Sequence, residues 1–78
     1  MNLDPKNAVD ENELGNAYFW GNEEIKQDLK QAVVWYQKAA DKGLPIAIFN
    51  LAYCYEFGHG VKKDNAEAKR LFAIANKL

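Results

Sequence analysis

The chain has 78 residues, with 10 Lys and Arg against 11 Asp and Glu and a formal net charge of -1. This length provides for one small domain, and the balanced charge argues against the clustered basic surface that binds nucleic acid. Because the chain has no Ser or Thr, one His and one Cys, we expect no catalytic residue, no metal site and no cofactor.

Two helices are predicted in the first half of the chain. The pair Asp4-Pro5 is a start signal, because proline is tolerated at the first helical position. The first helix would cover about residues 5–20, with Gly21 ending it in a left-handed conformation. After a loop, Asp28 caps a second helix that runs to about Lys42.

The second half of the chain repeats this order. Pro45 begins a third helix, which runs to about Phe57 and is ended by Gly58. Asp64 then caps a fourth helix that runs to about Lys77. Because β-branched residues are few and scattered, no strand is expected, and the fold class is all-α.

The two halves are also similar residue by residue. Residues 14–21 (LGNAYFWG) align with residues 51–58 (LAYCYEFG), so that Leu, Tyr and Gly recur in the same places. Further along, Trp35-Tyr36 aligns with Leu71-Phe72 if the first loop holds an extra residue. This self-similarity predicts two repeats of one helix-turn-helix unit.

A short α/α solenoid of four antiparallel helices follows from this pattern. The first repeat covers about residues 5–42 and the second about residues 45–77. Alanines such as Ala32 and Ala68 lie where antiparallel helices would approach closely. We expect the two repeats to form a single domain over residues 1–78.

These repeats resemble the Sel-one-like repeat, a tetratricopeptide-like α/α repeat. The family pattern has a Leu-Gly pair and a Tyr before a Gly-containing loop, and then Ala, a Trp-Tyr pair and an Ala pair. Leu14-Gly15, Tyr18, Ala32, Trp35-Tyr36 and Ala39-Ala40 stand in these places. The resemblance implies a non-catalytic scaffold or adaptor that offers a concave groove to a peptide or protein.

The resemblance also implies which side chains face a ligand. In this architecture the first helix of each pair lines the concave side, and positions outside the family pattern point away from the core. Asn amides can donate to and accept from a peptide backbone together, and aromatic residues are frequent anchors at interfaces. The alternative for the aromatic residues is burial against a neighbouring helix. The candidate partner-binding residues are Asn12, Asn16, Trp20, Asn50, Tyr53 and Phe57.

His59 and Cys54 are the remaining candidates for chemistry. His59 lies between two glycines, and the nearby sequence offers no partner for acid–base work, so we expect an exposed turn residue. Cys54 lies in the third helix and is expected to behave as a small buried hydrophobe. Nothing near it would lower the pKa of the thiol.

Several features indicate a cytoplasmic protein. Residues 1–7 lack the basic and apolar stretches of a signal peptide, and no run approaches the roughly 18 apolar residues of a membrane span. A single cysteine cannot form an intramolecular disulfide, which is typical of a reducing compartment. We therefore expect neither a membrane nor a nucleic acid as partner.

The small size of the array leaves a second function open. Repeat arrays usually need about three repeats for stability, so one end could dock on another protein. A homo-oligomer, or a stand-alone regulator that blocks one enzyme or complex, could use Leu71, Ile74 and Leu78 of the last helix. The leading prediction is an interaction module that binds a peptide or protein segment in the groove.

Overall fold

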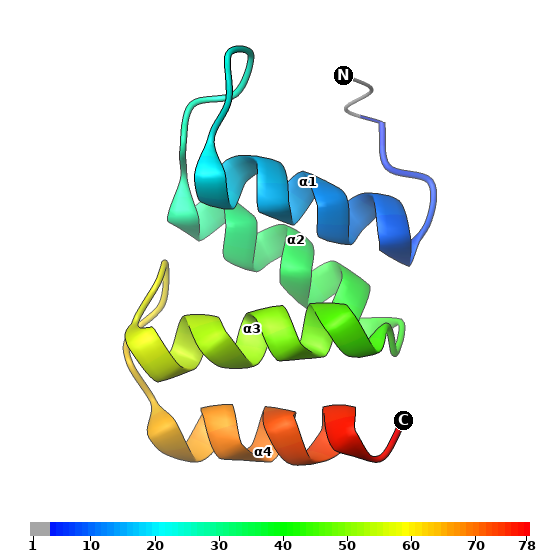
Figure 1. Ribbon diagram of the computed structural model, residues 1–78, viewed down its shortest axis with the longest axis vertical. Helices are drawn as coiled ribbons and strands as arrows, with labels where there is room; N and C mark the ends of the chain where they lie inside the picture. The colour runs from blue at the N-terminus through cyan, green and yellow to red at the C-terminus, as the bar shows by residue number, and fades with distance from the viewer. Residues whose placement is uncertain (1–3) are drawn as a thin grey trace.

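The computed structural model describes residues 4–78, which contain four helices and no strand. Figure 1 shows the helices stacked one below another with alternating directions, along the 34 Å longest dimension of the molecule. The predicted all-α solenoid of two helix pairs is therefore confirmed. None of the helices in this part of the chain has the length and apolar character needed to cross a membrane. The helices are α1 (Ala8–Trp20), α2 (Leu29–Asp41), α3 (Pro45–Phe57) and α4 (Asn65–Asn76).

The first helix begins later than the Asp4-Pro5 pair predicts. Asn7 is its N-cap, and the side-chain oxygen of Asn7 accepts a hydrogen bond from the backbone N–H of Asp10 at 2.9 Å. An asparagine side chain satisfies one of the free N–H groups at a helix start, which proline cannot do. The capping side chain, rather than the proline, therefore sets the start of α1.

The aspartates predicted as caps begin α2 and α4. Asp28 and Asp64 each accept a hydrogen bond from the backbone N–H three residues further on, at 3.1 and 3.0 Å. Their own N–H groups donate to the carbonyl oxygens of Tyr18 and Tyr55, at 2.8 and 2.9 Å. Each aspartate thus caps the second helix of its repeat. It also holds the start of that helix against the last turns of the first helix.

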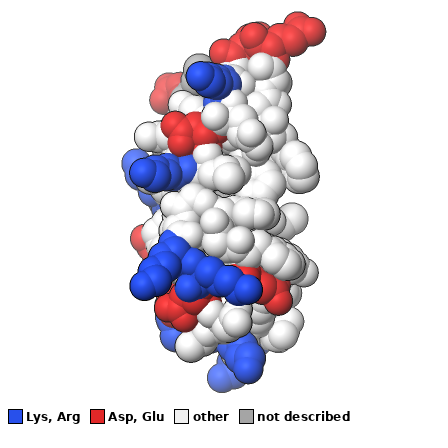
Figure 2. All heavy atoms as spheres, turned by 90° about the vertical axis from the view of Figure 1, so that its left-hand side faces the viewer, with Lys and Arg blue, Asp and Glu red and all other residues white. Residues whose placement is uncertain are grey.

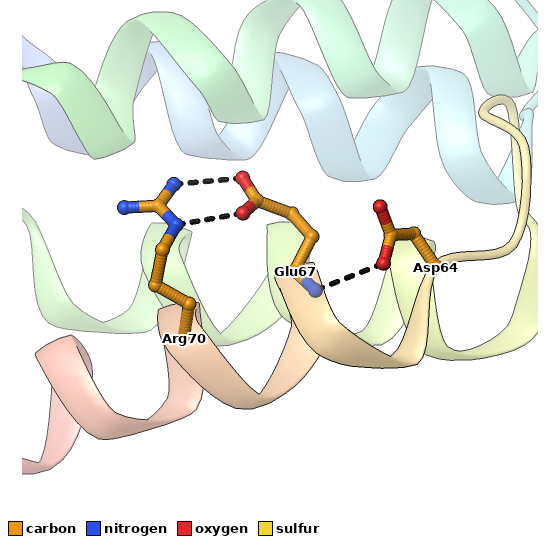
Figure 3. Close-up of polar contacts among 3 residues, drawn as sticks. All are labelled: Asp64, Glu67 and Arg70. Atoms are coloured by element: carbon orange, nitrogen blue, oxygen red, sulfur yellow. Dashed lines mark hydrogen bonds and ion pairs between the residues drawn. The ribbon is translucent and has the colours of Figure 1, made fainter.

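A charged pair follows the cap of α4, as Figure 3 shows. Arg70 donates hydrogen bonds from two guanidinium nitrogens to the carboxylate of Glu67, at 2.6 and 2.7 Å. These hydrogen bonds hold the pKa of Glu67 below its ordinary value. Because both groups lie at the surface, solvent and salt screen the pair, and the cap at Asp64 matters more for the helix.

The hydrophobic core lies where the two repeats meet. Tyr36 of α2, Leu51 and Cys54 of α3 and Leu71 of α4 are buried and belong to one cluster. The cluster draws on both repeats, so each repeat buries the apolar face of the other.

Gly15 allows a close approach between α1 and α2. A Cβ atom at this position would lie only 2.6 Å from a ring carbon of Tyr36, so the ring occupies space that any side chain would fill. The hydroxyl of Tyr36 donates a hydrogen bond to Asn16 Oδ1 at 2.5 Å. The glycine therefore lets a core side chain reach across α1 and position Asn16.

Candidate functional site

A hollow of about 300 Å³ lies over α1 and α3, towards the C-terminal ends of these helices. Figure 2 views the molecule from the side where these helices end and shows uncharged atoms over much of the centre and right, with charged side chains mainly on the left, at the top and across the lower part. The residues that line the hollow are Asn16, Phe19 and Trp20 of α1, Tyr36 of α2, Asn50, Tyr53 and Phe57 of α3, and His59 of the following loop.

Two asparagine amides have their orientation set by hydrogen bonds. The hydroxyl of Tyr36 donates to Asn16 Oδ1, and Asn50 Nδ2 donates to Asn12 Oδ1 at 3.0 Å. Burial raises the pKa of Tyr36 far above its ordinary value, with a smaller contribution from Cys54, so the hydroxyl remains a donor. Within residues 4–78, Asn16 Nδ2 and Asn50 Oδ1 have no hydrogen-bond partner and remain available to a ligand.

Aromatic rings form a connected row across the hollow. The ring centroid of Phe19 lies 4.9 Å from that of Trp20 and 5.4 Å from that of His59. His59 continues the row to Phe57 at 5.9 Å, and Phe57 lies parallel to Tyr53 at 6.4 Å. The outer members remain open to solvent, since Trp20 is 74%, Phe57 60% and Tyr53 49% exposed.

His59 is half-buried in this row, so the prediction of an exposed turn residue is wrong. The loop that carries it turns at Gly58 and Gly60, which adopt positive φ angles of 70° and 76°. A side chain on Gly60 would overlap the carbonyl oxygen of Leu29, so the loop packs directly on the start of α2. The two glycines around His59 were the sequence signal for a constrained loop.

Two Sel1 repeats match this chain, over residues 9–44 and 45–78. The chain belongs to the Sel1 repeat family. Sel1 repeats generally act as non-catalytic protein–protein interaction modules, so a ligand-binding rather than a catalytic surface is the expected functional feature.

Curated relatives of this Sel1 chain are much longer. Protein sel-1 homolog 2 of Mus musculus is 40% identical over 70 residues, which cover 88% of this chain and 10% of the relative. DAP3-binding cell death enhancer 1 of Rattus norvegicus is 41% identical over 51 residues, which cover 64% of this chain and 10% of the relative. The chain therefore spans about a tenth of the length of the curated relatives it matches.

Solved structures share the same fold. A Sel1 repeat protein from Oxalobacter formigenes superposes with a TM-score of 0.87 and 42% identity, covering 91% of this chain and 29% of the other. A protective antigen present in uropathogenic Escherichia coli strains, which displays an SLR fold, gives a TM-score of 0.85 and 47% identity over 90% of this chain and 15% of the other. The two helix pairs of this chain thus have the geometry of Sel1 repeats in longer arrays.

The structure gathers most of the predicted binding residues of this Sel1 domain around the hollow but leaves Asn12 outside it. Asn12 is only 5% exposed, and its side chain holds the amide of Asn50. It faces the interior, where its Oδ1 accepts a hydrogen bond from Asn50 of α3 at 3.0 Å. The other predicted residues, Asn16, Trp20, Asn50, Tyr53 and Phe57, all line the hollow.

Three residues of the hollow, Phe19, Tyr36 and His59, are not among the candidate binding residues of the sequence analysis. The ring of Tyr36 is buried, and its hydroxyl reaches the wall of the hollow through Asn16. His59 was expected to be exposed. Tyr36 and His59 both come from segments outside the first helix of each pair, so a rule based on those helices could not find them.

The remaining candidates divide between core and surface. Cys54 is buried, as expected, and burial raises the pKa of its thiol to about 11. Leu71 is 6% exposed and packs in the core, so the prediction that it contributes to a docking surface is wrong. Ile74 and Leu78 are exposed, as that prediction required. In the part of the chain that the structure describes, no group of three or more His, Cys, Asp or Glu side chains could hold a metal ion.

Proposed function

We propose that this Sel1 repeat domain binds a peptide or protein segment in the hollow over α1 and α3, as a non-catalytic interaction module. The observation that carries the proposal is the row of solvent-exposed rings beside two oriented amides. Clusters of exposed large apolar side chains are uncommon on folded proteins and mark interaction surfaces. Trp20, Tyr53 and Phe57 form such a cluster on neighbouring helices.

The amides provide a way to hold the backbone of the bound segment. Asn16 offers a donor in Nδ2, and Asn50 offers an acceptor in Oδ1. A peptide unit presents one carbonyl acceptor and one N–H donor, so the two amides match it. Because hydrogen bonds to Tyr36 and Asn12 already orient the amides, binding would cost less side-chain entropy.

An adaptor role in the cytoplasm is part of this proposal. The balanced charge of the chain suits a protein partner better than a nucleic acid, and the single cysteine suits a reducing compartment. As an adaptor, the domain would connect the partner bound in its groove to other proteins that the Sel1 protein contacts.

Affinity capture from the source cell's lysate tests the groove. The double variant Trp20→Ala/Tyr53→Ala removes exposed rings of the hollow without touching the amide network. The matched control, Val34→Ala/Ile46→Ala, removes exposed apolar side chains of α2 and α3 that do not line the hollow. We expect a partner, identified by mass spectrometry, to be lost by the groove variant and kept by the control, with both variants folded by circular dichroism. A partner kept by both variants would contradict the groove assignment.

A second candidate function is a stand-alone regulator that docks through the end of α4. The observation in its favour is the exposure of Ile74, in the last turn of α4, and of Leu78, two residues beyond the end of that helix. The variant Ile74→Asp/Leu78→Asp belongs in the same capture experiment. Loss of the partner in this variant alone would favour the regulator. Loss of a dimer in light scattering would instead assign this surface to self-association.

A further inference from the structure

The walls of the hollow carry no permanent charge. Among the described residues, none of those that line it is Lys, Arg, Asp or Glu. A charged side chain inserted here would lose hydration without gaining a counter-ion, which is costly. Charge complementarity therefore favours an uncharged segment as the occupant.

Hydrogen-bonding groups of both kinds line the hollow. Asn16 Nδ2, the Tyr53 hydroxyl and the exposed Trp20 indole can donate to carbonyl oxygens of a bound segment, and Asn50 Oδ1 can accept from an N–H. A proline-rich polyproline II helix suits these groups. It has no internal hydrogen bonds, so its carbonyl oxygens and the N–H groups of its non-proline residues are all free.

The ring surfaces point to the same occupant. Proline-rich segments dock on aromatic-lined grooves, where the flat pyrrolidine rings pack against exposed aromatic rings. Trp20, Tyr53 and Phe57 provide such surfaces on α1 and α3. A segment that is already extended before binding also loses little conformational entropy, which suits an open hollow of about 300 Å³.

We propose that the hollow binds an uncharged, proline-rich segment in the polyproline II conformation. This inference rests on the proposed function and specifies the chemistry of its partner. The pyrrolidine rings pack on Trp20, Tyr53 and Phe57, and Asn16 donates to a carbonyl oxygen of the segment.

The test is a nuclear magnetic resonance titration of the ¹⁵N-labelled chain with decaproline. The comparison peptide is a Gly-Ser repeat of the same length, which is uncharged but has an N–H at every residue. We expect decaproline to shift the indole signal of Trp20 and the side-chain amide signals of Asn16 and Asn50. The indole of Trp35 on α2 does not line the hollow and serves as the internal control. The Gly-Ser peptide should bind at least about tenfold more weakly.

Variants locate the binding surface. Tyr53→Ala should weaken decaproline binding by about tenfold, and Ile46→Ala, on the same helix but outside the hollow, should leave it unchanged. Equal binding of both peptides, or shifts at Trp35 without shifts at Trp20, would overturn the proposal.

The result also separates this inference from the proposed function. If decaproline shifts nothing while the Trp20→Ala/Tyr53→Ala variant still loses a captured protein, the groove stands and the proline chemistry is overturned. If decaproline shifts nothing and no captured protein depends on the rings, both proposals fall.

Discussion

Tyr36 links the core of this Sel1 domain to its candidate binding surface. Its ring occupies the space left by Gly15, and its hydroxyl orients the amide of Asn16. Asn12 does the same for Asn50 from below the surface. The polar atoms offered to a partner are thus positioned by residues that the partner would not touch, which limits the entropy lost on binding.

Cys54 makes the domain less stable as the pH becomes alkaline. Burial raises the pKa of its thiol from an ordinary 9.0 to about 11, so the folded chain keeps a proton that the unfolded chain loses. The free energy of unfolding therefore falls as the pH rises from about 9 to about 11. We expect the thiol to account for a loss of about 2 kcal/mol by pH 10.5, measured by urea denaturation.

The variant Cys54→Ala isolates this contribution. It keeps Tyr36, so the difference between the two pH profiles belongs to the thiol and to its smaller effect on the pKa of Tyr36. The profile of the variant should be shallower between pH 8 and pH 10.5, by about 2 kcal/mol. Parallel profiles would show that the thiol ionises equally in the folded and unfolded states.

Within each repeat, the capping aspartate joins the start of the second helix to the end of the first. Asp28 and Asp64 cap α2 and α4 through their side chains and hold the preceding helix through their backbone N–H groups. Because these hydrogen bonds are the same in both repeats, the second helix begins at the same place relative to the first in each, although the two loops differ in length. Both loops lie on the left-hand side of the stack in Figure 1, the side where α1 and α3 end and where the hollow also lies.

Removing a cap should weaken its helix by a predictable amount. We expect Asp64→Ala to lower the free energy of unfolding by about 1 kcal/mol, because the N–H of Glu67 loses its acceptor. Asp64→Asn keeps an acceptor oxygen at the same place and should lower the free energy of unfolding by only about 0.3 kcal/mol. Both are measured by thermal or urea denaturation. A loss as large in the asparagine variant would mean that charge, rather than capping, is what matters.

The whole molecule depends on the contact between its two repeats. The core cluster spans α2, α3 and α4, and within residues 4–78 neither helix pair has a second pair to pack against. In repeat proteins the interface between neighbours supplies much of the stability. We therefore expect the two repeats to unfold together.

Ile48 and Ile46 of α3 test this coupling as a matched pair. Ile48 is 4% exposed in the core cluster, whereas Ile46 is 56% exposed. Ile48→Ala should lower the free energy of unfolding by about 2–4 kcal/mol, and Ile46→Ala by no more than about 0.5 kcal/mol. Hydrogen exchange should show protection falling in α1 and α4 together for Ile48→Ala. Loss of protection in α3 and α4 alone would show that the repeats unfold separately.

Much of the fold could be read from local signals. Asp28, Asp64 and Pro45 mark helix starts through interactions within a few residues, and the repeated Leu, Tyr and Gly positions mark the two helix pairs. The start of α1 was misplaced because Pro5 and Asn7 are both start signals, and only the capping hydrogen bond distinguishes them. Local signals of equal strength cannot be ranked without the geometry.

The candidate site depended more on tertiary structure. Four helices, two related repeats and the two helices that carry the candidate aromatic and amide side chains could be predicted from the sequence, because these features depend on spacing along the chain. The folded chain places Asn12 in the interior, hydrogen-bonded to Asn50 of α3, while Asn16 lines the hollow. The seating of the second loop on α2 placed His59 among the rings. Burial and convergence depend on neighbours distant in the chain, so only the folded structure could decide them.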